Sequence, residues 1–445
     1  MNNKYERIMH LSVRVGSLSL VFAILLSLVI QDHTGVLPLG LFNTARESHA
    51  QVANACLIVI SAIFVTLLAE AWRAGRWRLA AAMRRGLFLL VASELLIGGL
   101  DRLLVSRNAQ SSLGGPYYER RTSDGTWVFL KKRHAGSPLG FRADHPYKLV
   151  PDHRRILFLG DSYTEGSGRA RACNYPSVVE KVLRDQLLDA EVMNAGVAGY
   201  GPVDTLNLLK LLREQGYRFD ALIYNLFTEN DFTDNLPNTD RRIIGGMIFR
   251  VPHSWFLRTF HPLNSYLFRY ALLVWRMGTL SAEEEKQFSL EAGNCIFSEK
   301  RHGEVSPALD ELIRQRLAGS QRVALSKRAQ QEFINTMAAM KTEADKLRIP
   351  FIVIVFPDRV IADSELRLRL KLYAKQMAPL DSLHSLVYQS LPNVPIIDVV
   401  DVLRGHPDMY RMGDTHLSDL GNKIAGEYVG EKLARLLRTT GLGGS

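Results

Sequence analysis

Short motifs in the second half of the chain contain the residue types that acyl transfer requires. Such chemistry needs a nucleophile, a base, a group that orients the base, and donors for an oxyanion. Ser162 in "GDSYTEG" supplies a hydroxyl and a backbone N–H, and His416 in "GDTHLSDLG" supplies a base. Asp414 stands two positions before His416, so on an extended segment its carboxylate points the same way and could orient the imidazole. The other candidate donors are the N–H of Gly199 in "NAGVAGYG" and the amide of Asn230 in "TEND".

Each motif also has an interpretation without catalysis. Gly-Asp-Ser is common in turns, and Asn230 and Asp231 could form a turn after a strand. His416 could simply precede a helix that has Ser418 as its N-cap. His406 in "RGHPDMY" competes for the role of base, but it has no carboxylate at an equivalent spacing. No His, Asp and Glu cluster has metal-ligand spacing, so we expect neither a metal nor a cofactor.

The motifs follow short apolar runs that are typical of buried parallel strands. Segments of helical periodicity, such as 175–190 and 203–216, alternate with these runs. This alternation predicts an α/β fold of three layers, with a parallel sheet covered on both faces. Ligands bind such sheets at the carboxyl ends of the strands, where we expect the motifs to meet. The candidate strands are 155–160, 190–196, 221–227, 351–357 and 394–400.

The alternation breaks between about 236 and 345, where we expect a helical insertion. The aromatic and basic stretch 253–277 is interpreted as an amphipathic helix packed on the sheet, with a lid or a membrane-surface helix as the alternative. Residues 306–350 predict one long helix or two, ending at Pro350.

Three apolar runs near the N-terminus predict transmembrane helices at about 12–30, 52–71 and 86–105. Each approaches the roughly 20 residues that a spanning helix needs, although buried helices of a soluble core are the alternative. Positive charge favours a cytoplasmic N-terminus and second loop, which places the chain after about residue 106 on the extracytoplasmic (periplasmic) side. The basic residues of these segments are Lys4, Arg7 and Arg14, then Arg73, Arg76, Arg78, Arg84 and Arg85, whereas the first loop has only Arg46.

The predicted organisation is a membrane segment over 1–106, a linker and lead-in over 107–150, and an α/β domain over 151–440. Glu94 lies within the third predicted span, where we interpret it as a protonated or hydrogen-bonded group facing the other two helices.

The composition of the chain limits the kinds of partner that it could bind. The chain has 445 residues and a formal net charge of +10, but no nucleic-acid motif, and the loop arginines account for part of the excess. We therefore expect a lipid bilayer as a partner and no nucleic acid. The three cysteines form neither a disulfide framework nor a metal spacing. Cys56 lies in an apolar run, while Cys173 and Cys295 could pair only if the fold brought them together.

In this order, the four motifs resemble those of the SGNH (GDSL-type) hydrolase family. The resemblance covers about residues 137–437, including the lead-in "SPLGFR". It implies a flavodoxin-like parallel sheet and a serine esterase. The implied roles are Ser162 as nucleophile and oxyanion donor, Gly199 and Asn230 as further donors, His416 as base, Asp414 as its partner, and Asp161 and Asp231 as supports of their loops.

Two departures from the family pattern bear on the substrate. Thr228 stands where the family has a glycine, and Glu229 separates it from Asn230. The acid and base are spaced D-x-H, whereas the family pattern is D-x-x-H. The shorter spacing resembles that of the alginate acetyltransferase branch.

The predicted function is a membrane-anchored serine esterase that acts on acyl esters, chiefly O-acetyl esters, of extracytoplasmic carbohydrate. The first alternative is an O-acyltransferase that modifies an envelope or exported polysaccharide, with polysaccharide assembly proteins as partners. The second is a non-catalytic carbohydrate-binding envelope component.

Overall fold

The computed structural model describes residues 73–75, 88, 92–93, 95–96, 117–124, 126–131, 139–143, 145–166, 169–186, 188–234, 239–244, 247–252, 295, 307–411 and 415–439. The chain divides into two compact units. The larger comprises Gly115–Pro237 with Gly278–Ser445, and the smaller comprises Met1–Gly114 with Asn238–Met277.

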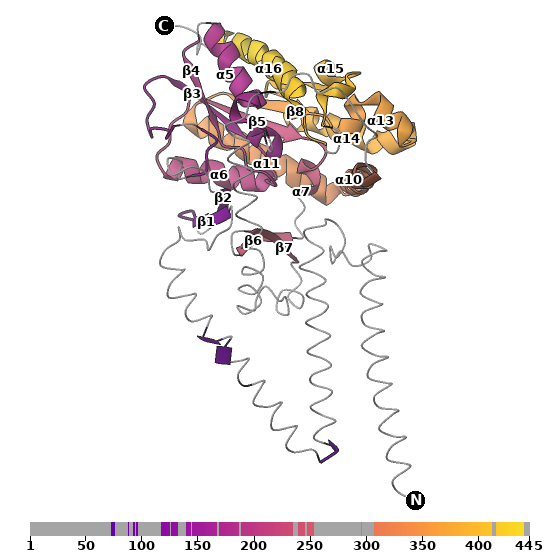
Figure 1. Ribbon diagram of the computed structural model, residues 1–445. Coiled ribbons are helices and arrows are strands. Elements are labelled where there is room, and N and C mark those ends of the chain that lie inside the picture. The colour runs from indigo at the N-terminus through magenta and orange to yellow at the C-terminus, as the bar shows by residue number, and fades with distance from the viewer. Residues whose placement is uncertain are drawn as a thin grey trace, which may run out of the picture. The chain divides into compact units, whose positions relative to one another are not determined.

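A parallel sheet of five strands forms the centre of the larger unit (Figure 1). In three of the five strands, β4, β5 and β8, every residue is buried, because helices cover both faces, and this explains the mainly apolar sequences of β5 and β8. The spatial order β4-β3-β5-β8-β9 is the flavodoxin-like order 2-1-3-4-5, so the predicted sheet is confirmed. The strands are β3 (Arg154–Leu159), β4 (Ala190–Asn194), β5 (Ala221–Phe227), β8 (Phe351–Phe356) and β9 (Ile396–Asp398).

Helices form the two outer layers (Figure 1). On one face α5 (Tyr175–Asp185) packs against α16 (Asp419–Thr439), and on the other α6 (Pro202–Glu214) packs against α11 (Lys327–Leu347). The α5–α16 contact is close because α16 carries glycines where it meets α5. A Cβ at Gly426 would lie 2.6 Å from Val178 Cβ.

The predicted helix over 306–350 is two helices. α10 (Pro307–Leu325) ends before Ser326, whose hydroxyl accepts a hydrogen bond from Ala329 N at 3.2 Å and thereby caps α11. α11 ends at Leu347, before Pro350, as expected. α14 (Ala374–Ser390) packs on α10 and α11, and the short helices α12 (Arg359–Ala362), α13 (Ser364–Arg369) and α15 (Val400–Leu403) complete this part of the unit.

Two antiparallel hairpins were not predicted. β1 (Tyr117–Arg121) and β2 (Trp127–Lys131) lie within the predicted linker, and β2 packs against α6. β6 (Thr239–Ile244) and β7 (Met247–Pro252) belong to the smaller unit and replace the start of the predicted helical insertion. Between them the sequence has Gly-Gly, a pair that favours two-residue hairpin turns over helix.

Most of the predicted membrane segment lies outside the described residues, as do Cys56, Glu94 and the rest of the predicted insertion apart from Cys295 and α10–α11. Within the described ranges, no helix combines the length and apolar character needed to cross a bilayer. Phe88, Leu95 and Leu96 of the third predicted span are helical, and they are 72%, 71% and 65% exposed.

Candidate active site

Ser162 and His416 meet at the carboxyl end of β3. Ser162 is the first residue of the short helix α4 (Ser162–Glu165), which directly follows the strand. His416 Nε2 lies 2.7 Å from Ser162 Oγ, although the two residues are 254 positions apart in the chain. An imidazole at this distance can take the hydroxyl proton as the oxygen attacks a carbonyl.

The segment that carries His416 is held from two sides. The Tyr163 ring stacks on the imidazole, with centroids 5.4 Å apart, and its hydroxyl donates to Thr415 O at 2.6 Å. On the other side, Arg411 N donates to His416 O at 3.0 Å, and the buried Arg359 donates from Nη1 to Arg411 O at 2.6 Å. These contacts keep the ring against the nucleophile.

Asp414 lies outside the described residues, so its role as the partner of His416 stays a prediction. Ser418 caps α16 by accepting a hydrogen bond from Gly421 N at 3.0 Å. The helix-cap interpretation is therefore right for Ser418, and it coexists with the contact of His416 with Ser162. The competing His406 is exposed.

Asp161 and Asp231 are buried in the loops that follow β3 and β5. Asp161 accepts a hydrogen bond from Tyr163 N at 2.9 Å and caps α4, while burial raises its pKa to about 6. Asp231 accepts hydrogen bonds from Tyr224 OH at 2.9 Å and from Phe227 N at 3.0 Å, and burial raises its pKa well above the usual value. Both carboxyl groups thus point into the protein and brace their loops.

The two further oxyanion candidates follow the strands that flank β3. Gly199, after β4, is exposed and has φ +83°, with open space where a Cβ would lie. Asn230, after β5, donates from Nδ2 to Asp234 Oδ2 at 2.9 Å. They therefore lie at the same edge of the sheet as Ser162, in loops on either side of it, and their donor roles remain predictions.

Glu165 is a site residue that sequence reasoning missed. It is 1% exposed and forms a buried ion pair with Lys131 of β2. Its second carboxylate oxygen accepts a hydrogen bond from Ala198 N at 2.5 Å, one residue before Gly199. Glu165 therefore joins the nucleophile helix to the glycine loop and, through Lys131, to the β1–β2 hairpin.

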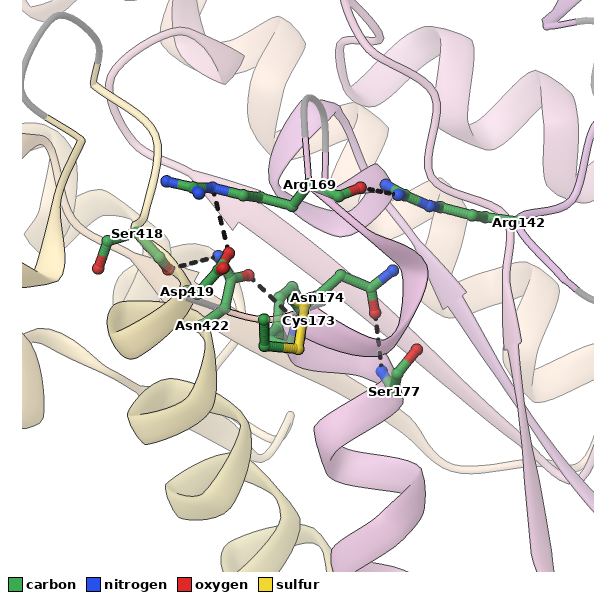
Figure 2. The surroundings of a disulfide bond; sticks show 10 residues. Arg142, Arg169, Cys173, Asn174, Ser177, Ser418, Asp419 and Asn422 are labelled. Carbon is green, nitrogen blue, oxygen red and sulfur yellow. Dashed lines mark hydrogen bonds and ion pairs between the residues drawn. A yellow bond between two sulfur atoms is a disulfide. The ribbon is translucent and has the colours of Figure 1, made fainter. Parts of the chain in front are cut away.

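Arg142, in the lead-in, is a second missed residue. Its buried guanidinium donates to three carbonyl groups, that of Glu165 at the end of α4 and those of Gly166 and Arg169 after it. Figure 2 shows its contact with Arg169. The end of a helix leaves carbonyl groups without intrahelical donors, and Arg142 supplies these donors. The partners lie 23 to 27 residues away in the chain, so no local pattern could indicate them.

Thr228 and Glu229, the residues that depart from the family pattern next to Asn230, make contacts within the protein. Thr228 Oγ1 accepts a hydrogen bond from Asp358 N at 2.8 Å. Glu229 is 1% exposed and pairs with Arg316 Nη1 at 2.7 Å. Burial, and next the charge of Glu229, raise the pKa of Asp358 to about 8. The Glu229 carboxylate is therefore buried and paired.

The fold brings Cys173 and Cys295 together in a disulfide, with Cα atoms 5.4 Å apart (Figure 2). The bond attaches residue 295 to the 3₁₀ turn Arg171–Cys173, which precedes α5. Beside it, Asn422 of α16 accepts a hydrogen bond from Tyr175 N at 3.1 Å. The segment between α4 and α5 is thus held at its end by both a covalent bond and a hydrogen bond.

A small hollow, open to solvent, lies beside the nucleophile and base. Among the described residues, no group of three or more His, Cys, Asp or Glu side chains is arranged to hold a metal ion. The hollow is lined by Ser162, Tyr163, Gly166, Arg169, Arg411, His416, Leu417 and Asn422.

Comparison with family models and with curated proteins found no match for this chain. Comparison with solved structures found esterases and lipases. AlinE4, described as an SGNH-hydrolase family esterase, is 16% identical with a TM-score of 0.29, and the match covers 65% of this chain and 98% of that one. The esterase EstA from Pseudoalteromonas sp. is 11% identical with a TM-score of 0.32, covering 64% and 99%. The lipase Lip_vut3 from a goat rumen metagenome is 13% identical with a TM-score of 0.34, covering 62% and 95%. The function proposed below rests on the side-chain geometry of this chain instead of on these likenesses.

Proposed function

We propose that this chain is a membrane-anchored serine esterase of the SGNH type, which hydrolyses acyl esters, chiefly O-acetyl esters, of carbohydrate outside the cytoplasm. The observation that carries the proposal is the 2.7 Å contact between Ser162 Oγ and His416 Nε2. It is made at the carboxyl end of a parallel sheet, where such folds bind their ligands.

The reaction follows from this geometry. Ser162 Oγ attacks the ester carbonyl as His416 takes its proton, and the N–H groups of Ser162 and Gly199 with the Asn230 amide would stabilise the oxyanion. When the tetrahedral intermediate collapses, His416 returns the proton to the departing sugar oxygen and leaves an acyl-Ser162. Water, activated by the same imidazole, then attacks the acyl carbon and releases the acid.

Two observations support a site outside the cytoplasm, and a third supports the membrane anchor. The Cys173–Cys295 disulfide is the kind of bond that forms and persists in oxidising compartments. The arginine-rich second loop favours a cytoplasmic location for that loop. The exposed apolar side chains of Phe88, Leu95 and Leu96 are suited to a lipid surrounding.

An O-acyltransferase that modifies an envelope or exported polysaccharide is the second candidate, favoured by the D-x-H spacing of Asp414 and His416. The same acyl-Ser162 would then be resolved by a sugar hydroxyl in place of water. Thr228 and Glu229, which depart from the family pattern next to Asn230, both make internal contacts, and these contacts do not favour the non-catalytic alternative.

A fluorophosphonate probe, which phosphonylates activated serines, tests the proposal. We expect the full-length chain to be labelled and Ser162→Ala to be unlabelled, while Ser385→Ala, a change at an exposed serine of α14, is labelled like the wild type. Equal labelling of wild type and Ser162→Ala, or none of either, would contradict the proposal. Acetate release from an activated acetyl ester, with and without acceptor glycan, then separates hydrolysis from transfer, because a transferase yields acetylated glycan.

A further inference from the structure

The loop over residues 228–234 carries Asn230, and its own hydrogen bonds hold that residue in place. The Asn230 carbonyl accepts hydrogen bonds from Asp234 N at 2.7 Å and from Thr233 Oγ1 at 2.8 Å, both in the short helix α7 (Asp231–Asp234). The side-chain amide of Asn230 donates to Asp234 Oδ2 at 2.9 Å. The direction in which this amide faces a substrate therefore depends on where the loop lies.

Helix α10 packs closely on this loop (Figure 1). A Cβ at Gly319 of α10 would lie 3.0 Å from Thr233 Cγ2, so the glycine permits an approach that a side chain would crowd. Thr233 is the residue whose hydroxyl donates to Asn230 O. The position of α10 is thus transmitted to Asn230 through a single intervening side chain.

One turn earlier on α10, Arg316 forms an ion pair with Glu229, the residue directly before Asn230. Arg316 Nη1 lies 2.7 Å from Glu229 Oε1, and the side chains of Glu229 and Arg316 are 1% and 28% exposed. A buried carboxylate that loses its counter-charge is strongly unfavourable, so the pair favours one position of residue 229 relative to α10. Arg316 and Gly319 lie three positions apart and so share one face of the helix, which meets the loop at two points.

We infer that Glu229 and Arg316 are positioning residues for Asn230, and that this ion pair sets the geometry of the oxyanion site. The inference rests on the proposed function, in which the Asn230 amide stabilises the oxyanion. Neither residue is assigned a contact with the reacting atoms, and both act through the loop. An oxyanion donor works only within a narrow range of distance, and a misplacement of about 1 Å can cost about 100-fold in rate.

The test measures kcat and KM of the full-length chain with 4-nitrophenyl acetate. We expect Arg316→Gln and Glu229→Gln each to lower kcat by about 10-fold or more, because a misplaced donor stabilises the transition state less. KM should change by less than about 3-fold, since the lost interaction is made only in the transition state. Arg322→Gln, at an exposed position of the same helix, is the matched control and should change neither constant.

A double-mutant cycle with Asn230 separates positioning from a general loss of structure. Asn230→Ala removes the donor and should lower kcat by about 100- to 1000-fold. In that background Arg316→Gln should cause little further loss, because its effect passes through the missing amide.

Two further variants guard against a folding effect. Arg316→Gln leaves Glu229 buried without its partner, whereas Glu229→Gln removes the buried charge itself, so thermal unfolding is measured for both. Arg316→Lys, which keeps the positive charge but loses the planar fork, should recover part of kcat.

A loss of kcat in Arg316→Gln that persists undiminished beside Asn230→Ala would overturn the inference and leave the esterase intact. A kcat equal to that of the wild type in Glu229→Gln, or in Asn230→Ala, would do the same. A wild type that is neither labelled by the fluorophosphonate probe nor able to release nitrophenol would instead overturn the esterase, and this positioning role with it.

Discussion

The Lys131–Glu165 ion pair shows how a single buried contact can position a catalytic loop. Glu165 → Gln keeps an oxygen for Ala198 N but leaves the Lys131 ammonium buried without its counter-charge. Because breaking a buried pair is strongly destabilising, we expect Glu165→Gln to lower the free energy of unfolding by about 3 kcal/mol, measured by urea denaturation. Lys131→Met combined with Glu165→Gln should recover most of this loss. Simple addition of the two single effects would show that the pairing is not its cause.

Gly199 and Gly216 form a natural comparison for the predicted oxyanion role. Their φ angles are +83° and +85°, and both have open space where a Cβ would lie. An alanine at either position should cost about 1 kcal/mol of stability, since the left-handed conformation is unfavourable for any side chain. Only Gly199→Ala should also lower kcat for ester hydrolysis. Alanine keeps the backbone N–H, so equal kcat in the two variants would contradict the expected sensitivity of the oxyanion site to the conformation of residue 199.

Asp161 makes stability depend on pH in a direction opposite to that of a salt-bridged carboxylate. Its folded pKa of about 6 exceeds the usual aspartate value of 3.8, so the folded state binds more protons between these values and loses stability as pH rises through them. The difference corresponds to about 3 kcal/mol. Asp161→Asn keeps a capping oxygen without the buried charge. We therefore expect its free energy of unfolding, relative to wild type, to rise by roughly that amount between pH 4 and 7; a pH-independent difference would contradict this.

The nucleophile and base were predictable because each stands in a short motif, and that of Ser162 directly follows β3. Arg142, Lys131 and Arg316 were not, since their roles come from partners that only the fold brings near. Periodicity indicates which face of an element is buried, but not which buried charge will meet which carbonyl or carboxylate. These residues are therefore visible only in three dimensions.

At the scale of elements, the five strands of the central sheet were predicted because burial on both faces produces continuous apolar runs. The β6–β7 hairpin was missed for the opposite reason. Its strands are short and mix charged with apolar residues, so their alternation did not stand out within a stretch interpreted as helical. The Gly-Gly pair between them was the overlooked signal.

The disulfide should contribute a large share of the stability of the larger unit. It closes a loop of 122 residues, and in the chain-entropy account a loop of this length stabilises by roughly 4–5 kcal/mol. We expect Cys173→Ala with Cys295→Ala to lower the urea midpoint markedly, and a reductant to shift the wild type to the same midpoint without affecting the double variant. A midpoint unchanged by reductant in both proteins would show that the bond carries no such stabilisation.

At the scale of the whole molecule, the proposed topology places the catalytic unit outside the cytoplasm. Alkaline phosphatase fused to the C-terminus, which is active only after disulfide formation in an oxidising compartment, should be active, and a fluorescent protein that matures only in the cytoplasm should stay dark there. The converse pattern would contradict the membrane topology and the extracytoplasmic substrate together.

Ser162 and His416, 254 positions apart in the chain, are also separated in time during synthesis. At about 5–20 residues per second, the ribosome adds the nucleophile roughly 13–50 s before the base. Throughout that interval α5 lacks α16, the helix it packs against, and Ser162 has no imidazole to take its proton. We therefore expect a growing chain to be inert towards esters until the segment that carries His416 and α16 has been added.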